Sequence, residues 1–288
     1  MNFEERLNAY KSRVEAALKA LPMENAPEPL RSAMRYSLLA GGKRLRGLIT
    51  LAACEMAGGN PEDAVPFACA AEMIHAYSLI HDDLPAMDND TLRRGKPTNH
   101  VVYGEAVAIL AGDGLLTHAF EVMAASRHPR AFAALGEMAR AAGIGGMLRG
   151  QTLDVTLEGT APGLNTVRDI HLGKTAALLT APVTAGLLLG GADEAQLAAG
   201  RRYGTHLGLS FQIVDDLLDI EGDAATLGKT VGKDAKEGKI TWPACVGVDA
   251  ARQDAENHVL AAVDALQIFG DKAAFLQALA QSTLHRVQ

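Results

Sequence analysis

The chain has 288 residues, of which 48% are hydrophobic and 21% charged, so it can bury a large core and intrinsic disorder is excluded. A net charge of −7 argues against a nucleic-acid partner, because phosphate backbones are bound by clustered Lys and Arg. Ala supplies 51 residues and aromatic side chains only 5%, a composition that favours helices over strands and predicts an all-α fold.

Helical patterning recurs along the whole chain between short breaks rich in Pro or Gly. We expect helices near residues 3–20, 29–40, 43–57, 62–81, 98–125, 130–149, 166–190 and 194–220, then two pieces over 250–285. The breaks have the lengths of loops in a compact helical bundle, which predicts a single domain over residues 1–288. The segment 222–239 is rich in Gly and Lys and is either a solvated loop or a flap over a site.

Three features bear on where the protein works. Its first twenty residues are charged and amphipathic and lack the apolar block of a signal peptide. Cys54, Cys69 and Cys245 show no metal-type spacing and are interpreted as reduced core residues, which predicts a cytoplasmic protein. Residues 175–192 carry no charge but include Pro182 and three Gly, so we expect a buried core helix and no membrane span.

The first acidic cluster follows the apolar run of residues 62–81 and reads HDDLPAMDND. Its four Asp side chains repel one another, so a cation must offset them if they converge. Asp82 and Asp88 are six positions apart, about 240° around an ideal helix. They can share a cation only if Pro85 ends the helix and folds the chain back.

The second acidic cluster reads FQIVDDLLD and lies within an apolar helical stretch. Asp215 and Asp219 are at i and i+4 on one helical face. Acidic residues near a helix end would explain either cluster alone, but buried unpaired carboxylates are very costly. An Asp pair followed by a third Asp, on two apolar helices, favours a cation site of carboxylate oxygens. Such sites suit Mg²⁺ or Mn²⁺, with phosphate oxygens and water completing the shell.

Cationic residues in short motifs accompany both acidic clusters. The motifs are GGKRLR at 41–46, RRG at 93–95, KT at 174–175 and again at 229–230, and Lys239. Each one alone is explained by a solvated surface charge. Their proximity to the acidic clusters in the sequence favours diphosphate binding.

Taken in order, these motifs resemble those of the short-chain trans-isoprenyl diphosphate synthases. The matching stretches are GGKRLR, HAYSLIHDD, DDLPAMD with RRG, GQTLD at 150–154, GKTAALL at 173–179, FQIVDDLLD and LGKT at 227–230. The resemblance covers about residues 30–245, and the spacing of Asp83 and Asp88 is most like that of bacterial farnesyl diphosphate synthases. Gly47 stands where the family commonly has Pro, and Trp242 where Tyr is usual.

The resemblance implies helices around a deep apolar cavity, in a homodimer that condenses isopentenyl diphosphate with dimethylallyl and geranyl diphosphate. The product would be farnesyl diphosphate plus pyrophosphate, formed by ionisation, condensation and proton loss. Three Mg²⁺ ions, replaceable by Mn²⁺, would bind Asp82, Asp88 and Asp215. The resemblance makes these residues catalytic: Asp82, Asp83, Asp88, Lys174, Asp215 and Lys229.

The same resemblance divides the remaining site residues between two substrates. The allylic diphosphate would be held by Arg93, Lys174, Thr175, Gln212 and Lys229. Isopentenyl diphosphate would be held by Gly42, Lys43, Arg46, His75 and Arg94. Lys239 would help to close segment 222–239. A His on an apolar helix is often a satisfied core residue, and it is the family match that assigns His75 to the substrate.

Product length is predicted from the helix before Asp82. Tyr77 and Ser78 lie five and four residues before that Asp, and a bulky Tyr77 would form the floor of the cavity. An aromatic residue there resembles farnesyl-forming (C15) enzymes, whereas a small one goes with C20. The alternatives are a geranyl or geranylgeranyl diphosphate synthase, a class I terpene cyclase, or a non-catalytic subunit of a heteromeric prenyltransferase. Cyclases carry a different second motif, and such subunits tend to lose the Asp motifs.

Overall fold

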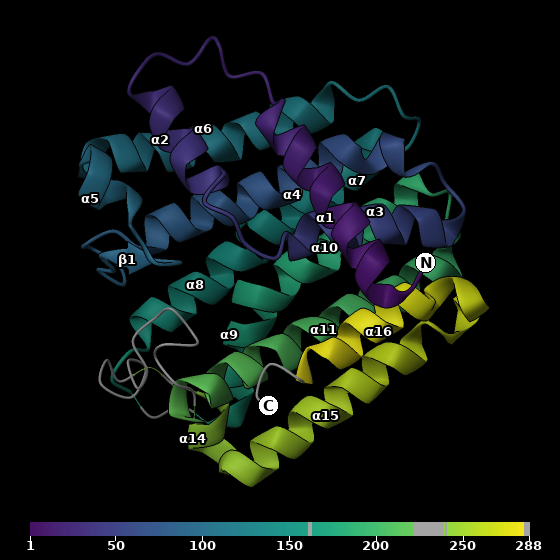
Figure 1. The fold of residues 1–288 in the computed structure, drawn as a ribbon. Coiled ribbons are helices and arrows are strands. Elements are labelled where there is room, and N and C mark those ends of the chain that lie inside the picture. Colours follow the sequence, from purple (N-terminus) through teal and green to yellow (C-terminus); the bar gives the residue numbers. More distant parts are fainter. Residues whose placement is uncertain (161–162, 222–238, 240, 285–288) are drawn as a thin grey trace.

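In the computed structural model of the chain, residues 1–160, 163–221, 239 and 241–284 are described. They form an all-α bundle, as the composition predicts (Figure 1). The longer helices are α1 (Phe3–Lys19), α2 (Leu30–Leu38), α3 (Leu45–Ala57), α4 (Pro61–Asp82), α6 (Glu105–Ala124), α7 (Ala131–Ala142), α8 (Met147–Thr156), α9 (Leu164–His171), α10 (Ala177–Leu189), α11 (Glu194–Glu221), α15 (Val248–Ala265) and α16 (Ala274–Ser282). The short elements are α5 (Asn99–Tyr103), η1 (Leu172–Ala176), α14 (Trp242–Val246), η2 (Gln267–Ala273) and a hairpin of β1 (Leu92–Arg93) with β2 (Lys96–Pro97).

Helix α10 lies at the centre of the bundle and packs against α3, α7 and α11 (Figure 1). Its approach to α3 is close, because a Cβ at Gly186 would lie 2.3 Å from the carbonyl oxygen of Thr50. Eleven of its residues are buried, which confirms the predicted core helix over the uncharged stretch. Two stretches, Glu105–Ala124 and Leu164–Leu189, are apolar and long enough to cross a membrane, but 78% of the second one's most apolar window is buried inside the protein.

Two predicted helices are broken at places where we expected continuity. Gly104, at φ +82°, separates α5 from α6. The helix predicted over 166–190 is continuous, because α9 passes through the wide π-type turn η1 into α10 with helical φ and ψ angles on both sides of the turn. The second break lies between α7 and α8, where Gly143 is extended and Gly146 has non-helical φ and ψ angles. A Cβ at Gly146 would lie 2.2 Å from the carbonyl oxygen of Ala141, so the turn is tight. Helix α8 therefore starts afresh at Met147 and extends to Thr156, well past the predicted end at 149.

Candidate active site

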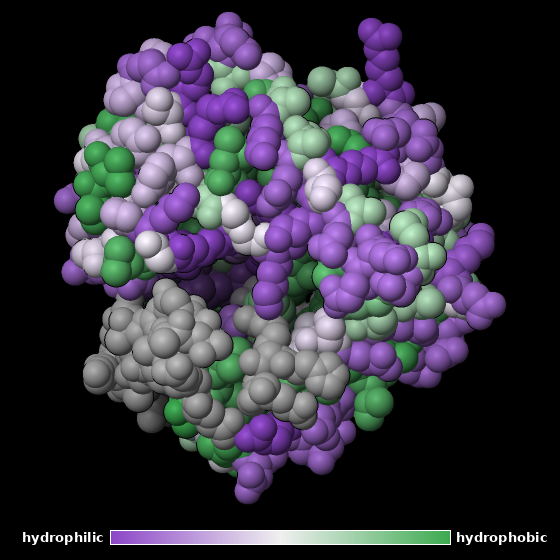
Figure 2. Space-filling model, in the orientation of Figure 1, coloured by the Kyte–Doolittle hydropathy of each residue, from purple (hydrophilic) through white to green (hydrophobic). Residues whose placement is uncertain are grey.

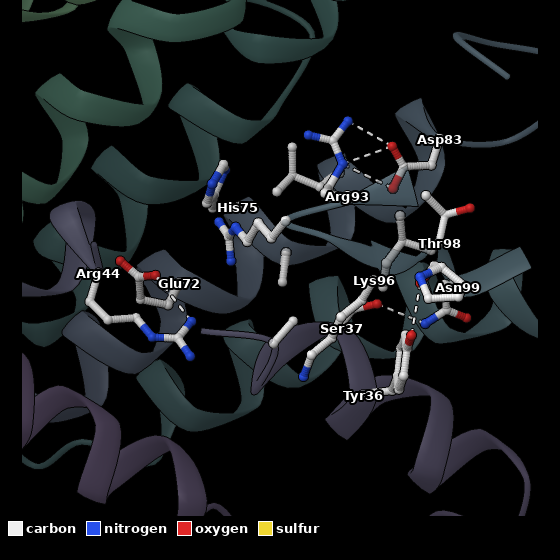
Figure 3. Close-up of a pocket in the computed structure, with 16 residues that line it drawn as sticks. Tyr36, Ser37, Arg44, Glu72, His75, Asp83, Arg93, Lys96, Thr98 and Asn99 are labelled. Carbon is white, nitrogen blue, oxygen red and sulfur yellow. Dashed lines mark hydrogen bonds and ion pairs between the residues drawn. The ribbon is translucent and has the colours of Figure 1, made fainter. Parts of the chain in front are cut away.

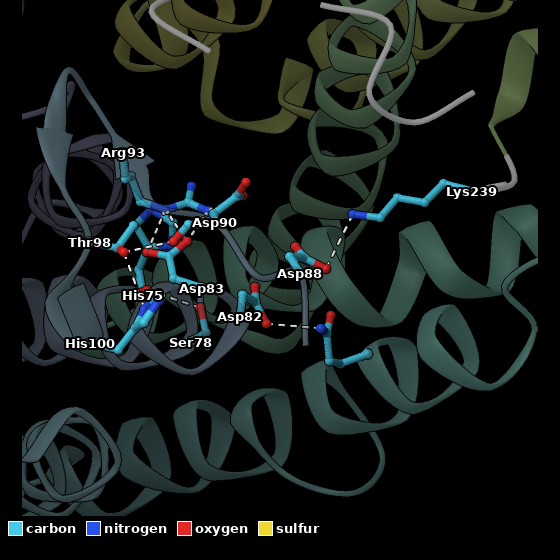
Figure 4. A network of polar contacts seen from close by, with 11 residues as sticks. His75, Ser78, Asp82, Asp83, Asp88, Asp90, Arg93, Thr98, His100 and Lys239 are labelled. Carbon is cyan, nitrogen blue, oxygen red and sulfur yellow. Dashed lines mark hydrogen bonds and ion pairs between the residues drawn. The ribbon is translucent and has the colours of Figure 1, made fainter. Parts of the chain in front are cut away.

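The chain folds back at the end of α4, as the first acidic cluster requires. The backbone N–H of Asp88 donates to the carbonyl oxygen of Asp82 at 2.8 Å, and that of Asn89 donates to Leu84 at 3.1 Å. Asn89 adopts φ +49°, a left-handed conformation that Asn tolerates well. Pro85 lies inside this turn, so the predicted reversal is confirmed. Asp82 and Asp88 thereby lie near each other in spite of their spacing (Figure 4).

The carboxylates of this cluster have different environments. Asp82 accepts a hydrogen bond from Nε2 of Gln151 at 2.9 Å. Burial raises the pKa of Asp82 to about 6, with Lys174 opposing the rise and Asp88 adding to it. Asp83 binds the guanidinium of Arg93 through Nε at 2.8 Å and Nη2 at 2.6 Å. Burial raises the pKa of Asp83 and Arg93 opposes that rise, so Asp83 would act through Arg93.

Two motif glycines explain how Lys174 reaches this cluster. A Cβ at Gly150 would lie 2.0 Å from the backbone nitrogen of Lys174, and one at Gly173 would lie 2.7 Å from the Cα of Gly150. The contact holds η1 against α8, where Lys174 Nζ meets Asp154 Oδ2 at 2.5 Å. Burial lowers the pKa of Lys174, but Asp154 and Asp82 outweigh burial and raise it, so the ammonium stays charged.

The second acidic cluster lies on α11 and is joined to η1 by hydrogen bonds. Thr175 donates to Oε1 of Gln212 at 2.7 Å, and Nε2 of Gln212 donates to Oδ1 of Asp216 at 3.0 Å. The other oxygen of Asp216 accepts the backbone N–H of Trp242 at 2.8 Å. Asp216 is buried, whereas Asp215 is only partly so. Asp216 therefore orients Gln212, and Asp215 is left on the more open side of the helix.

Trp242 is anchored by its backbone and by its ring. Its indole Nε1 donates to Oδ2 of Asp254 at 2.8 Å, and its ring stacks on His171 with 5.7 Å between centroids. The bond to Asp216 comes from the main chain, which any residue other than Pro could supply. Replacement of the usual Tyr by Trp thus keeps the contact between this segment and α11.

A cationic pocket lies beside the first cluster, between α2, α4 and the β1–β2 hairpin (Figure 3). His75, Arg93 and Arg94 line it, as do Arg44 and Glu72. Burial and the neighbouring arginines lower the pKa of His75 well below its ordinary value, so this imidazole is neutral. The predicted residues His75 and Arg94 are thus brought together with Arg93.

The loop before α3 supports Arg94. The Arg94 guanidinium donates to the carbonyl oxygen of Gly41, and a Cβ at Gly42 would lie 2.9 Å from that guanidinium. Gly42 has φ +122°, which further favours Gly there. Lys43 does not line the cationic pocket; it lines a separate cavity of about 320 Å³ with Phe211. The face of the molecule drawn in Figure 2 is mostly polar and is hollowed near its centre.

Lys239 approaches the first cluster from the other half of the chain, with Nζ 3.3 Å from Oδ1 of Asp88 (Figure 4). The predicted residue Lys229, and the rest of segment 222–238, lie outside the described residues. The described chain has no group of three or more His, Cys, Asp or Glu side chains arranged to enclose a metal ion by themselves. A site of one or two carboxylates completed by substrate phosphates and water is the kind that Mg²⁺ commonly takes. Asp82 and Asp88 fit such a site.

Tyr77 and Ser78 lie one turn before Asp82 on α4. Tyr77 is 4% exposed, and its ring meets that of His81 edge-on, 5.8 Å between centroids. Nε2 of His81 lies 3.0 Å from the carbonyl oxygen of Ile109 on α6. The Oη of Tyr77 is buried with no hydrogen-bond partner among the described residues, and burial raises its pKa to about 12. Ser78 donates to the carbonyl oxygen of His75 at 3.0 Å, so it is bonded to its own helix.

Comparison with known proteins decides the family. The sequence pattern of the polyprenyl synthetases matches residues 27–280. The chain belongs to the polyprenyl synthetase family. It is 47% identical to the farnesyl diphosphate synthase of Geobacillus stearothermophilus, over 91% of this chain and 90% of that protein. It is also 47% identical to a chloroplastic geranylgeranyl pyrophosphate synthase of Catharanthus roseus, over 95% of this chain and 78% of the relative.

Solved structures agree with this assignment. Geranylgeranyl pyrophosphate synthetase from Pyrococcus horikoshii superimposes with a TM-score of 0.90 at 31% identity, over 99% of each chain. An apo FPP/GFPP synthase from Zymomonas mobilis gives 0.86 at 33% identity, over 98% of this chain and 99% of that one. The all-α fold is thus that of polyprenyl synthetases, and the family acts on prenyl diphosphates.

Four residues of this polyprenyl synthetase site were not identified from the sequence. Gln151 and Asp154 lie within the GQTLD motif, so their spacing could have pointed to contacts with Asp82 and Lys174. Asp216 lies in the second acidic cluster, four residues after its partner Gln212, so its contact was also within reach of the sequence. Glu72 carries less signal, because it is a carboxylate within an apolar run and its partners are distant in the sequence.

Proposed function

We propose that this trans-prenyltransferase makes farnesyl diphosphate from isopentenyl diphosphate and the dimethylallyl and geranyl diphosphates. The observation that carries the proposal is the fold-back at α4, which gathers Asp82 and Asp88 with Lys174 and Lys239 next to the cationic pocket. Carboxylates that recruit Mg²⁺, beside cations that bind diphosphate, are suited to ionising an allylic diphosphate. Tyr77 supports the C15 product, because it is a bulky, buried side chain that packs against His81 one turn before Asp82.

The chemistry follows from where these charges lie. Asp82, Asp88 and Asp215 would hold Mg²⁺, which when bound adds positive charge beside the diphosphates. We propose three such ions, which Mn²⁺ could replace. As the allylic C–O bond breaks, its electron pair leaves with the diphosphate. Lys174 and Arg93 stabilise the developing negative charge.

The second substrate then reacts with the allylic cation. Isopentenyl diphosphate, held in the cationic pocket by His75 and Arg94, supplies the double-bond electrons that form the new C–C bond. The family resemblance adds Arg46 and Lys43 to this proposed binding set, although Lys43 lines the separate cavity beside Phe211. The proton lost from the adjacent carbon goes to the released pyrophosphate, so no protein base is required.

An assay with and without the metal tests this function. The purified protein is given isopentenyl and dimethylallyl diphosphates, and the products are dephosphorylated and separated by chromatography. We expect farnesol as the main product with Mg²⁺ and no condensation with EDTA, restored when Mg²⁺ is added back. Condensation that persists without any divalent ion would contradict the proposed mechanism, and geranylgeraniol as the main product would contradict the C15 proposal alone.

Replacing Tyr77 by Ala is expected to lengthen the product from C15 toward C20. The buried aromatic ring beside His81 would give way to a cavity that the growing chain can enter. The measurement is the ratio of C20 to C15 alcohols with excess isopentenyl diphosphate. Tyr77→Phe is the matched control, because it removes only the hydroxyl and should keep the C15 product. The same product ratio in Tyr77→Ala and wild type would show that the floor lies elsewhere.

We also propose that the protein is a cytoplasmic homodimer. Val101 and Val102 of α5 and Ile109 and Leu110 of α6 are 43–57% exposed, an apolar surface suited to a second copy of the chain. Cys54 and Cys69 are free, buried thiols, which supports a reducing compartment.

A further inference from the structure

Glu72 is a buried carboxylate that the proposed reaction does not use. It lies in the middle of α4 and is 4% exposed, among apolar neighbours such as Met73 and Ile74. A carboxylate in such a position is strongly destabilising unless cations and hydrogen-bond donors surround it. Its partners therefore indicate what it is for.

The first partner is the start of α3. The backbone N–H of Gly47, third residue of that helix, donates to Oε1 of Glu72 at 2.9 Å. Arg44, which precedes the helix at φ +53°, supplies no side-chain cap, so Glu72 caps α3 from a different helix. A Pro at 47, common in the family, could not donate this bond. A Cβ at Gly47 would lie 2.8 Å from Val14, so the helix start is also tightly packed.

The second partner is a group of arginines. Nη1 of Arg44 lies 3.8 Å from Oε2 of Glu72 (Figure 3). Burial lowers the pKa of Arg46 to about 10, and Glu72 is the carboxylate that opposes this most strongly. Burial and Arg44 lower the pKa of Arg94, and Glu72 again opposes the change. Glu72 thus contacts Arg44 directly and adds to the electrostatic stabilisation of Arg46 and Arg94, to which Asp215 and Asp83 also contribute.

These contacts connect Glu72 to the pocket itself. Arg44 closely follows Gly41, whose carbonyl oxygen accepts from Arg94, and Gly42, which leaves room for the Arg94 guanidinium. Arg46 is the second residue of α3, next to Gly47, and its Nε is buried with no hydrogen-bond partner among the described residues. Displacing that helix start would move Arg46 and the support of Arg94 together.

We propose that Glu72 is a positioning residue for isopentenyl diphosphate, which holds Arg46 and Arg94 in the arrangement that binds its diphosphate. This rests on the proposed function and adds a residue that does not touch the substrate. A positioning role and a purely electrostatic role predict opposite changes in diphosphate affinity when Glu72 is replaced. If Glu72 acted only as a negative charge, removing it would strengthen binding of a diphosphate. If it positions the arginines, removing it weakens binding.

Glu72→Gln is the decisive variant, because it keeps the shape of the side chain and removes the charge. Its amide can still accept from Gly47 but then presents N–H groups to Arg44. We expect KM for isopentenyl diphosphate to rise about tenfold or more, with KM for dimethylallyl diphosphate changing less than about twofold. Direct titration of isopentenyl diphosphate into both proteins measures the same comparison without turnover.

Controls separate positioning from general loss of structure. Glu55→Gln is matched in chemistry, since Glu55 on α3 bonds Arg6 and Tyr10 on the side facing α1, and it should leave the ratio of the two KM values unchanged. Glu72→Asp keeps the charge and should recover part of the affinity. It also carries the comparison if Glu72→Gln does not fold, as judged by thermal melting.

The outcomes are distinguishable from failure of the proposed function. A wild-type protein that neither condenses the two substrates nor binds isopentenyl diphosphate overturns both proposals. An active wild type, with unchanged or tighter isopentenyl diphosphate binding in folded Glu72→Gln, overturns the role of Glu72 alone.

Discussion

Asp82→Asn is expected to lower kcat by about 10²–10³-fold while the protein stays folded. The change keeps the size of the side chain and an oxygen that can accept from Gln151 at the present 2.9 Å. What it removes is the negative charge at the end of α4, where Asp82 and Asp88 would hold the metal. The variant should also need a higher Mg²⁺ concentration for half-maximal rate. Steady-state kinetics across a Mg²⁺ titration, with both substrates saturating, measures both effects.

The control for this variant is Asp90→Asn, in the same loop. Asp90 is partly buried and lies 3.7 Å from Nη2 of Arg93, but it is not predicted to bind metal. We expect a loss of less than about tenfold, through Arg93 alone. An Asp82→Asn variant that kept more than a tenth of the wild-type kcat at saturating Mg²⁺ would contradict the role given to Asp82.

The parts of this site that could be predicted from sequence are those with a local cause. Pro85 within an Asp-rich run indicates a chain reversal, because Pro ends a helix and the Asp side chains need a shared counterion. The structure has that reversal, with Asp88 bonded to Asp82. The apolar stretch of α10 was likewise predicted to be core, because its eighteen uncharged residues are near the lower length limit for a membrane span and are interrupted by Pro and Gly.

Other features depend on contacts that no local pattern encodes. Nothing local in the apolar sequence of α4 explains the carboxylate of Glu72. Its reason is a tertiary contact, since Oε1 accepts from the backbone N–H of Gly47 on α3 at 2.9 Å. The break before α8 was missed because the stretch around it is rich in Ala, whereas Gly146 has non-helical φ and ψ angles. The roles of Lys174 and Gln212 in substrate binding remain predictions, although their hydrogen-bond partners are now known.

Gly150→Ala is expected to destabilise the protein and lower its activity together. The added Cβ would lie 2.0 Å from the backbone nitrogen of Lys174 and 2.6 Å from the carbonyl carbon of Gly173, both backbone atoms that cannot rotate away. Ala favours a helix over Gly by about 1 kcal/mol, but overpacking of a fitted interface costs about 1–3 kcal/mol or more. Because the contact is between two backbones, we expect a net loss of about 2 kcal/mol in the free energy of unfolding.

The same displacement explains the expected loss of activity. Moving η1 away from α8 pulls Lys174 from Asp154, now at 2.5 Å, and shifts Gln151 from Asp82. Gly136→Ala is the matched control, since a Cβ on that α7 residue would meet only the Arg140 side chain at 3.5 Å. Chemical denaturation should show Gly136→Ala as stable as wild type or more so, and kcat/KM unchanged. If Gly150→Ala behaved in the same way, the closeness of α8 and η1 would not be what places Lys174 beside the first acidic cluster.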